Sequence, residues 1–269
     1  MRNYLVFILC IIHSVSLAQS LKKPLDHSAY DIWNTIKETK ITNDGNWITY
    51  RIQPGQGDPV VKLHDSNGNA QKSFERAKST EFSWNSDYLI FSISAPFDTI
   101  KNMRRRKVED EELPKDTLAI YNLKSQKLEK IPKVKSFLLP EEWSGQLAYL
   151  LDPVKIPEDT TIADSLKLTP KLNNDENGFT LILRSLESAK QDTFRYVLDY
   201  QFSKHGNQLV FQSGGDSTFH AGIYTFDCKK EILKPLFRAD GKYKKLTIDE
   251  EGRQIAFLAD LDTAKHTIR

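Results

Sequence analysis

Cysteine is almost absent from this sequence. Only Cys10 and Cys228 occur in 269 residues, and Cys10 lies in a segment that we expect to be removed. A single remaining thiol cannot form an intrachain disulfide, so stability has to come from packing. Cys228 stands in the turn-like stretch TFDCKKEI with no histidine beside it. We expect a partly buried and unreactive side chain there.

An excess of charge of one sign is also lacking. The chain has 38 basic and 36 acidic residues, a net charge of +2, and its 39% hydrophobic content is typical of a globular protein. Nothing in this balance predicts a polyanionic partner, so we expect no binding of nucleic acid.

The sequence has one long hydrophobic run, and it lies at the N-terminus. Arg2 precedes an apolar stretch from Tyr4 to Ile12, and Ser16 and Ala18 place small residues before a cut at Gln19. This is the pattern of a secretory signal peptide over residues 1–18, too short for a stable membrane span. We expect export to the periplasm or beyond, with no membrane span left after cleavage.

Helical periodicity is missing apart from a turn or two over SAYDIWNTIKET, before residue 41. A parallel α/β domain needs crossover helices between its strands, and the sequence has no room for them. An immunoglobulin-like sandwich also uses short strands, but it does not predict a unit that returns along the chain.

What the sequence does contain is a repeat. Four copies of the pattern are ITNDGNWITY at Ile41, FSWNSDYLIF at Phe82, FSKHGNQLVF at Phe202 and LTIDEEGRQIAF at Leu246. A less regular copy, LLPEEWSGQLAY, begins at Leu138. Each has Asp, Asn, Gly or other turn formers followed by a β-branched and aromatic strand, the pattern of a hairpin. A second, more polar hairpin follows each copy.

The repeating unit is therefore four strands, an inner hairpin and then an outer one. The shortest spacings, 41 residues from Ile41 and 44 residues from Phe202, match the ~40–50 residues of a propeller blade. We predict an all-β chain of four-stranded antiparallel blades over 41–269, starting near 41, 82, 138, 202 and 246, after a lead-in segment over 19–40. By this rhythm four blades and part of a fifth are present, and we expect the chain to be the N-terminal piece of a longer protein.

Two insertions interrupt the pattern. The first, Lys101 to Asp116, has the basic run Arg104 to Lys107 followed by acidic residues, and the second covers 152–178. The acids offset the basic run and no aromatic residue interleaves it, which argues against an anion-binding surface. We expect both insertions to be solvated loops.

Several stretches resemble a known family. KKPLDHSAYDIWNTIKETKITNDGNWITY, after the signal peptide, is similar to the start of exported bacterial S9 peptidases, the prolyl oligopeptidase family. LPKDTLAIYNLKSQKLEKI and YQFSKHGNQLVF resemble their propeller blades, and the resemblance extends over 21–269. It implies a propeller that caps an α/β-hydrolase domain and admits short or unfolded peptide substrates.

The catalytic part of that family does not appear in this sequence. Its nucleophile lies in a Gly-x-Ser-x-Gly elbow, with Asp and His partners, and no such motif occurs here. We therefore expect no catalytic residue in the chain and no activity from it alone. Its peptide partners would be met through the hydrolase domain.

One candidate for substrate binding is the carboxylate pair Glu141 and Glu142. In dipeptidyl-peptidase members of the family an acidic pair binds the amino terminus of the substrate, because two carboxylates match the donors of an ammonium. Here the pair stands where the other copies have their turn, which favours a solvated hairpin tip instead. Both interpretations are kept.

No cofactor or metal is expected. GQGDPV at Gly55 lacks the third glycine of a dinucleotide loop, and the calcium-like DSNGN at Asp65 has Arg76 where a bidentate glutamate would stand. The histidines outside the signal peptide show no metal-binding spacing. Two other functions stay open: a TolB-like periplasmic propeller that binds proteins, and a scaffold without a site.

Overall fold

The structure is a computed structural model that describes residues 27–68, 71–143, 145–152, 175–215 and 219–261. It shows an all-β protein built from antiparallel four-stranded sheets, as predicted from the repeat. The predicted signal peptide lies outside the described residues. None of the helices in the described ranges is long and apolar enough to cross a membrane.

The first two sheets have four strands each and follow chain order. The first blade consists of β1 (Asn34–Ile41), β2 (Trp47–Pro54), β3 (Val60–Asp65) and β4 (Gln71–Glu75). The second blade consists of β5 (Ala77–Phe82), β6 (Tyr88–Ile93), β7 (Thr117–Asn122) and β8 (Leu128–Pro132). Every neighbouring pair of strands is antiparallel, and all connections within these sheets are short except the one between β6 and β7, which contains the first insertion.

The third and fourth blades are joined in one sheet of seven strands. They comprise β9 (Val134–Leu138), β10 (Gln146–Leu151), β11 (Phe179–Ser185), β12 (Gln191–Phe202), β13 (Gln208–Ser213), β14 (Gly222–Asp227) and β15 (Ile232–Arg238). The long strand β12 is shared: it ends the third blade and, after a register shift between Val197 and Asp199, begins the fourth. Strands β16 (Lys242–Ile248) and β17 (Ile255–Asp260) form the described part of a fifth blade.

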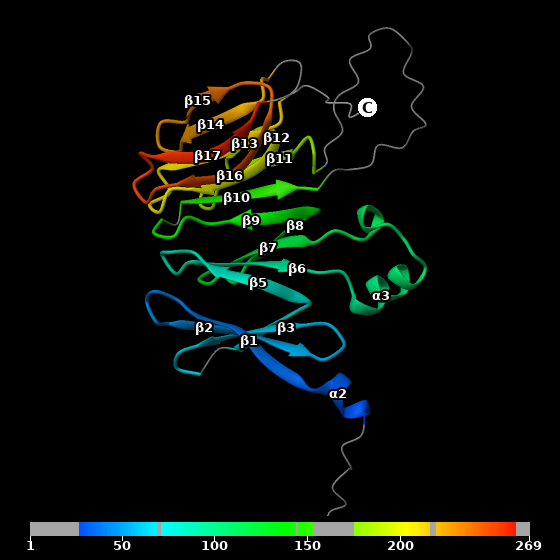
Figure 1. Cartoon of the computed structure of the whole chain (residues 1–269). Coiled ribbons are helices and arrows are strands. Elements are labelled where there is room, and N and C mark those ends of the chain that lie inside the picture. The colour runs from blue at the N-terminus through cyan, green and yellow to red at the C-terminus, as the bar shows by residue number, and fades with distance from the viewer. Residues whose placement is uncertain (1–26, 69–70, 144, 153–174, 216–218, 262–269) are drawn as a thin grey trace, which may run out of the picture.

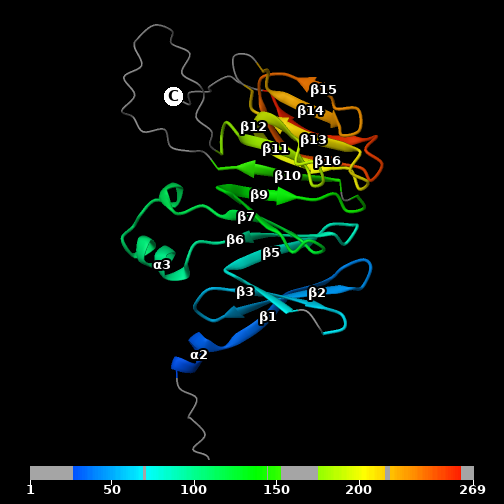
Figure 2. The ribbon, with the colours of Figure 1, turned by 180° about the vertical axis from the view of Figure 1, so that it is seen from behind.

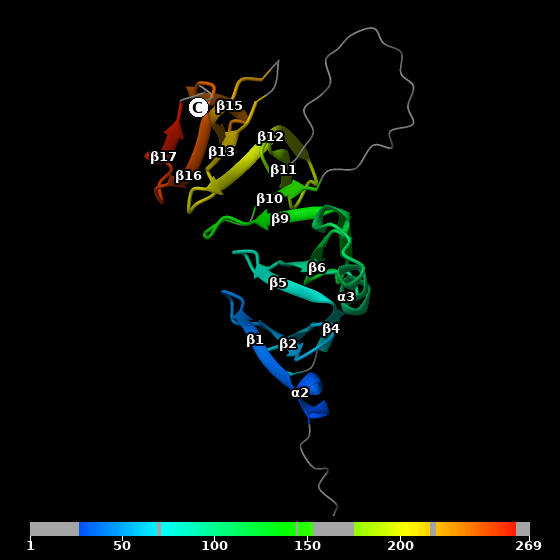
Figure 3. The ribbon, with the colours of Figure 1, turned by 45° about the vertical axis from the view of Figure 1, so that its right-hand side comes forward.

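The blades follow one another in chain order, from the blue first blade to the red fifth (Figure 1). Figure 2 shows the same order from behind, with helix α3 (Phe97–Arg105) on one flank of the second blade. In Figure 3 the first strands β1, β5 and β9 come one after another along one side of the molecule. No sheet closes on itself in the described part of the chain.

The core lies between blades, because the middle strands bury both faces. In β10, Leu147 and Tyr149 pack toward the second blade, while Ala148 and Leu150 pack toward the fourth. Alternation with period two places successive side chains on opposite faces. This explains why strands such as QLAYLL are apolar at every position.

Each seam between neighbouring blades therefore has its own buried cluster. The cluster between the second and third blades is made of Ile90, Leu118, Ile120, Val134, Leu147, Tyr149, Ile182 and Leu186.

The repeat begins earlier in each blade than the predicted starting points. Strand β1 covers Asn34–Ile41, so the segment that we assigned to a lead-in over 19–40 contains the innermost strand of the first blade. The turn that we placed at the start of each unit is instead the link between its first two strands. The innermost strands are largely exposed, and this exposure removes the apolar alternation that marks the other strands in the sequence.

The first insertion is not only a loop, which corrects the prediction. Helix α3 (Phe97–Arg105) and a single 3-10 turn (Asp110–Glu112) lie there. The basic residues end the helix: Lys107 has φ 57°, its N–H donates to the Arg104 carbonyl, and the Val108 N–H donates to the Met103 carbonyl. This helix stop is usually made by glycine, so its sequence signal is absent here. The basic run favours the helix C-terminus through the helix dipole.

A shorter helix, α2 (Ser28–Ile32), lies at the turn or two that the sequence indicated before β1. Most of the second insertion, 153–174, lies outside the described residues.

Candidate functional site

The turns between first and second strands are closed by a side chain, and this explains the repeat. The hydroxyl of Thr42 accepts the N–H of Trp47 at 3.0 Å, and the hydroxyl of Ser83 accepts the N–H of Tyr88 at 3.0 Å. Ser203 and Asp249 do the same, each for the residue five positions later, at 3.1 and 2.8 Å. A side-chain acceptor that bonds a nearby backbone N–H stabilises such turns.

The third turn departs from this rule. Pro140 stands where the others have Ser, Thr or Asp, and five residues rather than four separate it from Gln146. Proline has no side-chain acceptor, so this turn is held in another way. The turn contains Glu141 and Glu142, the predicted substrate-binding pair.

The structure separates the two glutamates. Glu142 bonds to the fourth blade: its carboxylate lies 3.0 Å from Lys204 Nζ and 3.1 Å from His205 Nδ1, and its N–H donates to the Lys204 carbonyl. Glu141 is exposed at the turn, where it lines a cleft on the side of the second blade and a smaller hollow on the side of the fourth and fifth blades. Glu142 thus joins two blades, and Glu141 remains the member of the pair that a ligand can reach. Substrate binding by either residue stays a prediction.

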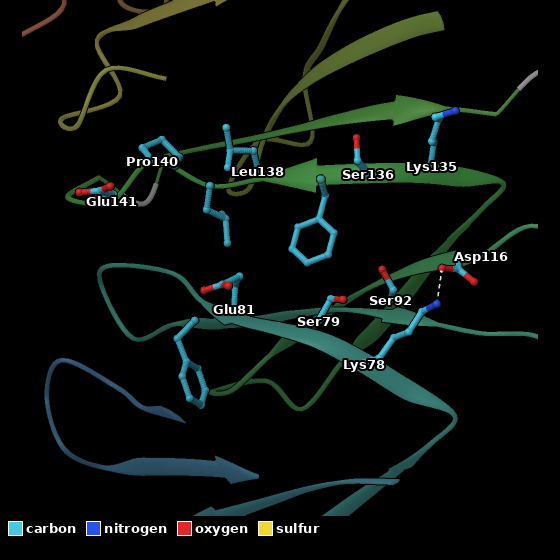
Figure 4. A pocket seen from close by; sticks show the side chains of 13 residues that line it. Lys78, Ser79, Glu81, Ser92, Asp116, Lys135, Ser136, Leu138, Pro140 and Glu141 are labelled. Carbon is cyan, nitrogen blue, oxygen red and sulfur yellow. Dashed lines mark ion pairs between the residues drawn. The ribbon is translucent and has the colours of Figure 1, made fainter. Parts of the chain in front are cut away.

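The cleft lies between the first strands of the second and third blades. Its volume is about 740 Å³, and it is lined by Lys78, Ser79, Glu81, Phe82, Ser92, Asp116, Lys135, Ser136, Phe137, Leu138, Leu139, Pro140 and Glu141. Figure 4 shows β5 and β9 on two sides of this space, running in the same direction. A volume of this size is typical of sites for small ligands or short peptides.

The cleft lies between the second and third blades because the side chains that join the first strands of the first and second blades have no counterparts between the second and third. Between the first and second blades, the Glu38 carboxylate accepts the Ser79 N–H at 3.1 Å and Glu81 pairs with Lys40 at 2.5 Å. Glu38 and Ser79 occupy equivalent positions in the first and second blades. Each lies four residues before the turn acceptor, and their φ angles are 52° and 53°.

At the second seam the side chains are too short or apolar. Across the cleft from Ser79 and Glu81 lie Ser136 and Leu138, at the same two positions of the third blade. The Ser136 hydroxyl bonds instead to the Tyr200 hydroxyl of β12 at 3.1 Å. In the described residues no ion pair or hydrogen bond joins β5 to β9. The middle and outer strands still hold the two blades together. They do so through the buried cluster between the second and third blades and through the Arg184 guanidinium, which donates to both carboxylate oxygens of Glu129 at 2.6 and 2.7 Å.

The charged side chains lie at the two ends of the cleft, as Figure 4 shows. Glu81 and Glu141 lie at the end near the turns, and Lys78, Lys135 and Asp116 at the other. Lys78 pairs with Asp116 at 3.0 Å, and Lys135 pairs with Asp175 at 2.6 Å. Glu141 makes no hydrogen bond or ion pair with any described residue.

Sequence reasoning missed Lys78, Glu81 and Lys135 as site residues. All three lie in first strands, at most a few residues before the turns that we took as starts of the repeat. A charge stands two residues before the turn position in the first two blades, at Lys40 and Glu81, and this is the sequence signal that could have found Glu81. Which charges meet depends on the seam, and the seam is a tertiary feature.

The other sequence candidates take structural or solvated roles. Cys228 is buried, and burial is the main cause that raises the pKa of its thiol to about 12, in agreement with an unreactive side chain. Arg104 and Arg105 end an exposed helix. Among the described residues no group of His, Cys, Asp and Glu is arranged to hold a metal ion.

The four-stranded antiparallel blades follow one another along the chain, and each packs against the next through a buried cluster. This arrangement defines a β-propeller architecture. No protein-family model and no curated protein matches the sequence.

Solved structures do match at low sequence identity. The acylaminoacyl peptidase of Pyrococcus horikoshii is 13% identical, with a TM-score of 0.48 over 87% of this chain and 37% of that one. The β-propeller domain of the Trilobed protease from Pyrococcus furiosus is 11% identical, with a TM-score of 0.48 over 84% and 62%. One of two prolyl endopeptidases is 11% identical, with a TM-score of 0.49 over 84% and 32%.

These structural neighbours come from peptidases of the kind that the sequence resembles. The chain spans just over a third of the length of the acylaminoacyl peptidases. The TM-scores are below 0.5, so the fold assignment rests on the strand pairing and order described above.

Proposed function

We propose that this chain is the non-catalytic propeller of an exported serine peptidase of the prolyl oligopeptidase type, and that it selects peptides by size. The observation that carries the proposal is the polar cleft of about 740 Å³ along the exposed first strands, where an extended peptide fits. A folded domain of ~100 residues has a radius of gyration of ~13 Å and is excluded from such a space. The family resemblance of the sequence supports the same role.

The chemistry of the chain supports a role without catalysis. Its sequence contains no Gly-x-Ser-x-Gly motif, and its one cysteine outside the predicted signal peptide is buried with a raised pKa. Hydrolysis would be supplied by the α/β-hydrolase domain that the resemblance implies.

The absence of activity can be measured directly. The purified chain should give no turnover of chromogenic dipeptide and tripeptide substrates that a serine-directed phosphonate inhibits. Phosphonate-sensitive turnover by this chain alone would refute a non-catalytic role.

Size selection separates this function from the TolB-like alternative. We expect the immobilised chain to retain unfolded peptides of a few residues and to release folded proteins. Retention of folded proteins with no retention of peptides would instead favour a module that docks partner proteins.

Export is tested by the mature N-terminus. Expressed in a bacterium with its own first 18 residues, the chain should be recovered from the periplasm or medium with Gln19 as its first residue. Recovery in the cytoplasm with Arg2 still present would contradict this part of the proposal.

A further inference from the structure

Two unpaired strand edges flank the cleft. Strand β5 is the first strand of its sheet and β9 the first of the next, so each has a strand partner on one side only. An edge strand carries N–H and C=O groups without a strand partner at every second residue. An extended peptide pairs with such an edge by adding a strand to the sheet.

Strand β9 is the better edge of the two. The N–H of Ser79 in β5 already donates to Glu38. In the described residues the backbone of Ser136 to Leu138 bonds to no strand other than β10. Ser136 and Leu138 are also exposed.

We propose that the cleft binds an extended peptide of about four residues as an added strand antiparallel to β9. A basic group of the peptide lies between Glu81 and Glu141. At the other end of the cleft Lys78 and Lys135 are already paired with Asp116 and Asp175, so no charge of the peptide is required there. The inference takes its class of ligand from the proposed function, and it adds the place, direction and charge pattern of binding.

The length follows from the edge of β9. From Lys135 to Leu138 this strand has four residues, and three steps of ~3.3 Å span roughly 10 Å, the length of an extended peptide of four residues.

The direction follows from the place of the basic group and the preferred pairing of the strands. Both β5 and β9 run toward the glutamate end of the cleft, so a peptide antiparallel to β9 with its basic residue at that end has this residue first (Figure 4). Antiparallel pairing is slightly more stable per residue than parallel pairing.

The basic group is matched at the turn end of the cleft. Glu141 has no partner among the described residues, whereas Glu81 shares its charge with Lys40. An ionised carboxylate only accepts hydrogen bonds, and an ammonium or guanidinium only donates them. Glu81 and Glu141 carry two negative charges and Lys40 supplies one positive charge, so one negative charge at this end is not compensated by a described residue.

Isothermal titration calorimetry with the full chain tests the proposal. The probe is an acetylated, amidated peptide of lysine, valine, threonine and glutamate in that order. Its control has glutamate first and lysine last. We expect saturable binding of the first peptide and at least threefold weaker binding of the second.

Backbone methylation tests strand addition. In an added strand only alternate N–H groups face β9, so of the two adjacent nitrogens of valine and threonine only one donates to the strand. Two peptides, each methylated at one of these nitrogens, should therefore differ: one should lose binding, and the other should bind within about twofold of the unmodified peptide.

Protein variants test the acidic end. Glu141→Gln should weaken binding of the lysine-first peptide about threefold, as for a partly solvated ion pair. Glu187→Gln, in the turn between β11 and β12, should leave it unchanged. Both glutamates are exposed, so both variants should keep the circular dichroism spectrum of the parent.

Three results would overturn the inference: no saturable heat at millimolar peptide, equal binding of the two peptide orders, or equal affinities of the two variants. None of these readouts measures hydrolysis or exclusion of folded proteins. A failure here therefore leaves the proposed function standing, and a failure of the proposed function leaves this binding measurable.

Discussion

At the scale of single residues, the chemistry of this chain is set by burial and by turn hydrogen bonds. Cys228 illustrates the first cause: packed in the core of the third and fourth blades, its thiol has a pKa raised to about 12. The thiolate, which reacts, is therefore scarce at neutral pH. The sequence prediction of an unreactive side chain rested on the absence of a histidine beside Cys228 in TFDCKKEI, and it agrees with the burial of the thiol.

We expect Cys228 in the folded chain to react with a disulfide reagent at about pH 8 at least a hundredfold more slowly than an exposed thiol. The comparison is the double variant Cys228→Ala with Ser125→Cys, because Ser125 lies in the exposed turn between β7 and β8. Denaturation in urea should remove the difference. Equal rates in the folded proteins would show that the thiol is accessible.

Turn carboxylates illustrate the second cause. The pKa of Asp44 is lowered chiefly by the hydroxyl of Thr42, and those of Asp227 and Asp249 chiefly by backbone N–H groups of Lys230 and Gln254. Groups whose pKa falls on folding contribute stability above their unfolded pKa, about 4, and lose it as the pH falls through the folded pKa.

Acid should therefore destabilise the chain partly through these three turns. In the triple variant Asp44→Asn, Asp227→Asn, Asp249→Asn, an amide oxygen still accepts the hydrogen bonds made to one oxygen of each carboxylate, and the side chain no longer titrates; the bond from the Asn46 side chain to the second oxygen of Asp44 is lost. Urea unfolding should show a smaller loss of stability between about pH 5 and about pH 3 than in the parent. Asp240→Asn, an exposed position, is the control. An unchanged acid slope in the triple variant would contradict this account.

At the scale of elements, the sequence predicts the hairpins well because their signal is local. A Ser, Thr or Asp that accepts an N–H five residues later is a pattern that recurs in the sequence at Thr42 and Ser83. The innermost strands were not predicted, because exposure removes their alternation. Positive φ at Glu38 and Ser79 has no sequence signal either, since neither residue is glycine.

The turn acceptor can be removed in one blade. Ser83→Ala deletes the acceptor of the Tyr88 N–H and the donor to the Asn85 side chain, at 3.0 and 2.8 Å. Because Ser83 is buried, the freed N–H gains little from water, and we expect a loss of about 1 kcal/mol in the free energy of unfolding. Ser125→Ala in an exposed turn should cost almost nothing. Equal stability of the two variants in urea would mean that the turn needs no acceptor.

The candidate site was predicted only in part. Glu141 was found from its neighbour Glu142, yet in the structure Glu141 lines the same cleft as Glu81, 60 residues earlier, while Glu142 bonds to the next blade. The partner of a side chain at a seam depends on how two blades pack. A repeat in the sequence shows that seams exist, and it does not show which of them will open.

At the scale of the whole molecule, the seam between the second and third blades differs from the first seam and from the last. Strand β1 lies against β5 and β12 lies against β16, while β5 and β9 flank an open cleft. This seam depends on its buried cluster, on the pair of Arg184 with Glu129, and on two hydrogen bonds, from the Tyr88 hydroxyl to the Leu186 carbonyl and from the Val134 N–H to the Asp116 carbonyl. Weakening the cluster should loosen this boundary before the rest of the chain.

Leu118→Ala tests this expectation, because Leu118 is fully buried in that cluster. A cavity there should cost about 3 kcal/mol. Native-state hydrogen exchange should show faster exchange in β7, β9 and β10, whereas β13 and β14, in the joined third and fourth blades, keep their protection. Leu128→Ala, where the side chain is 39% exposed, is the matched control and should change neither stability nor exchange measurably. A uniform loss of protection across all blades in Leu118→Ala would mean that the five blades open as one unit and that this seam is no weaker than its neighbours.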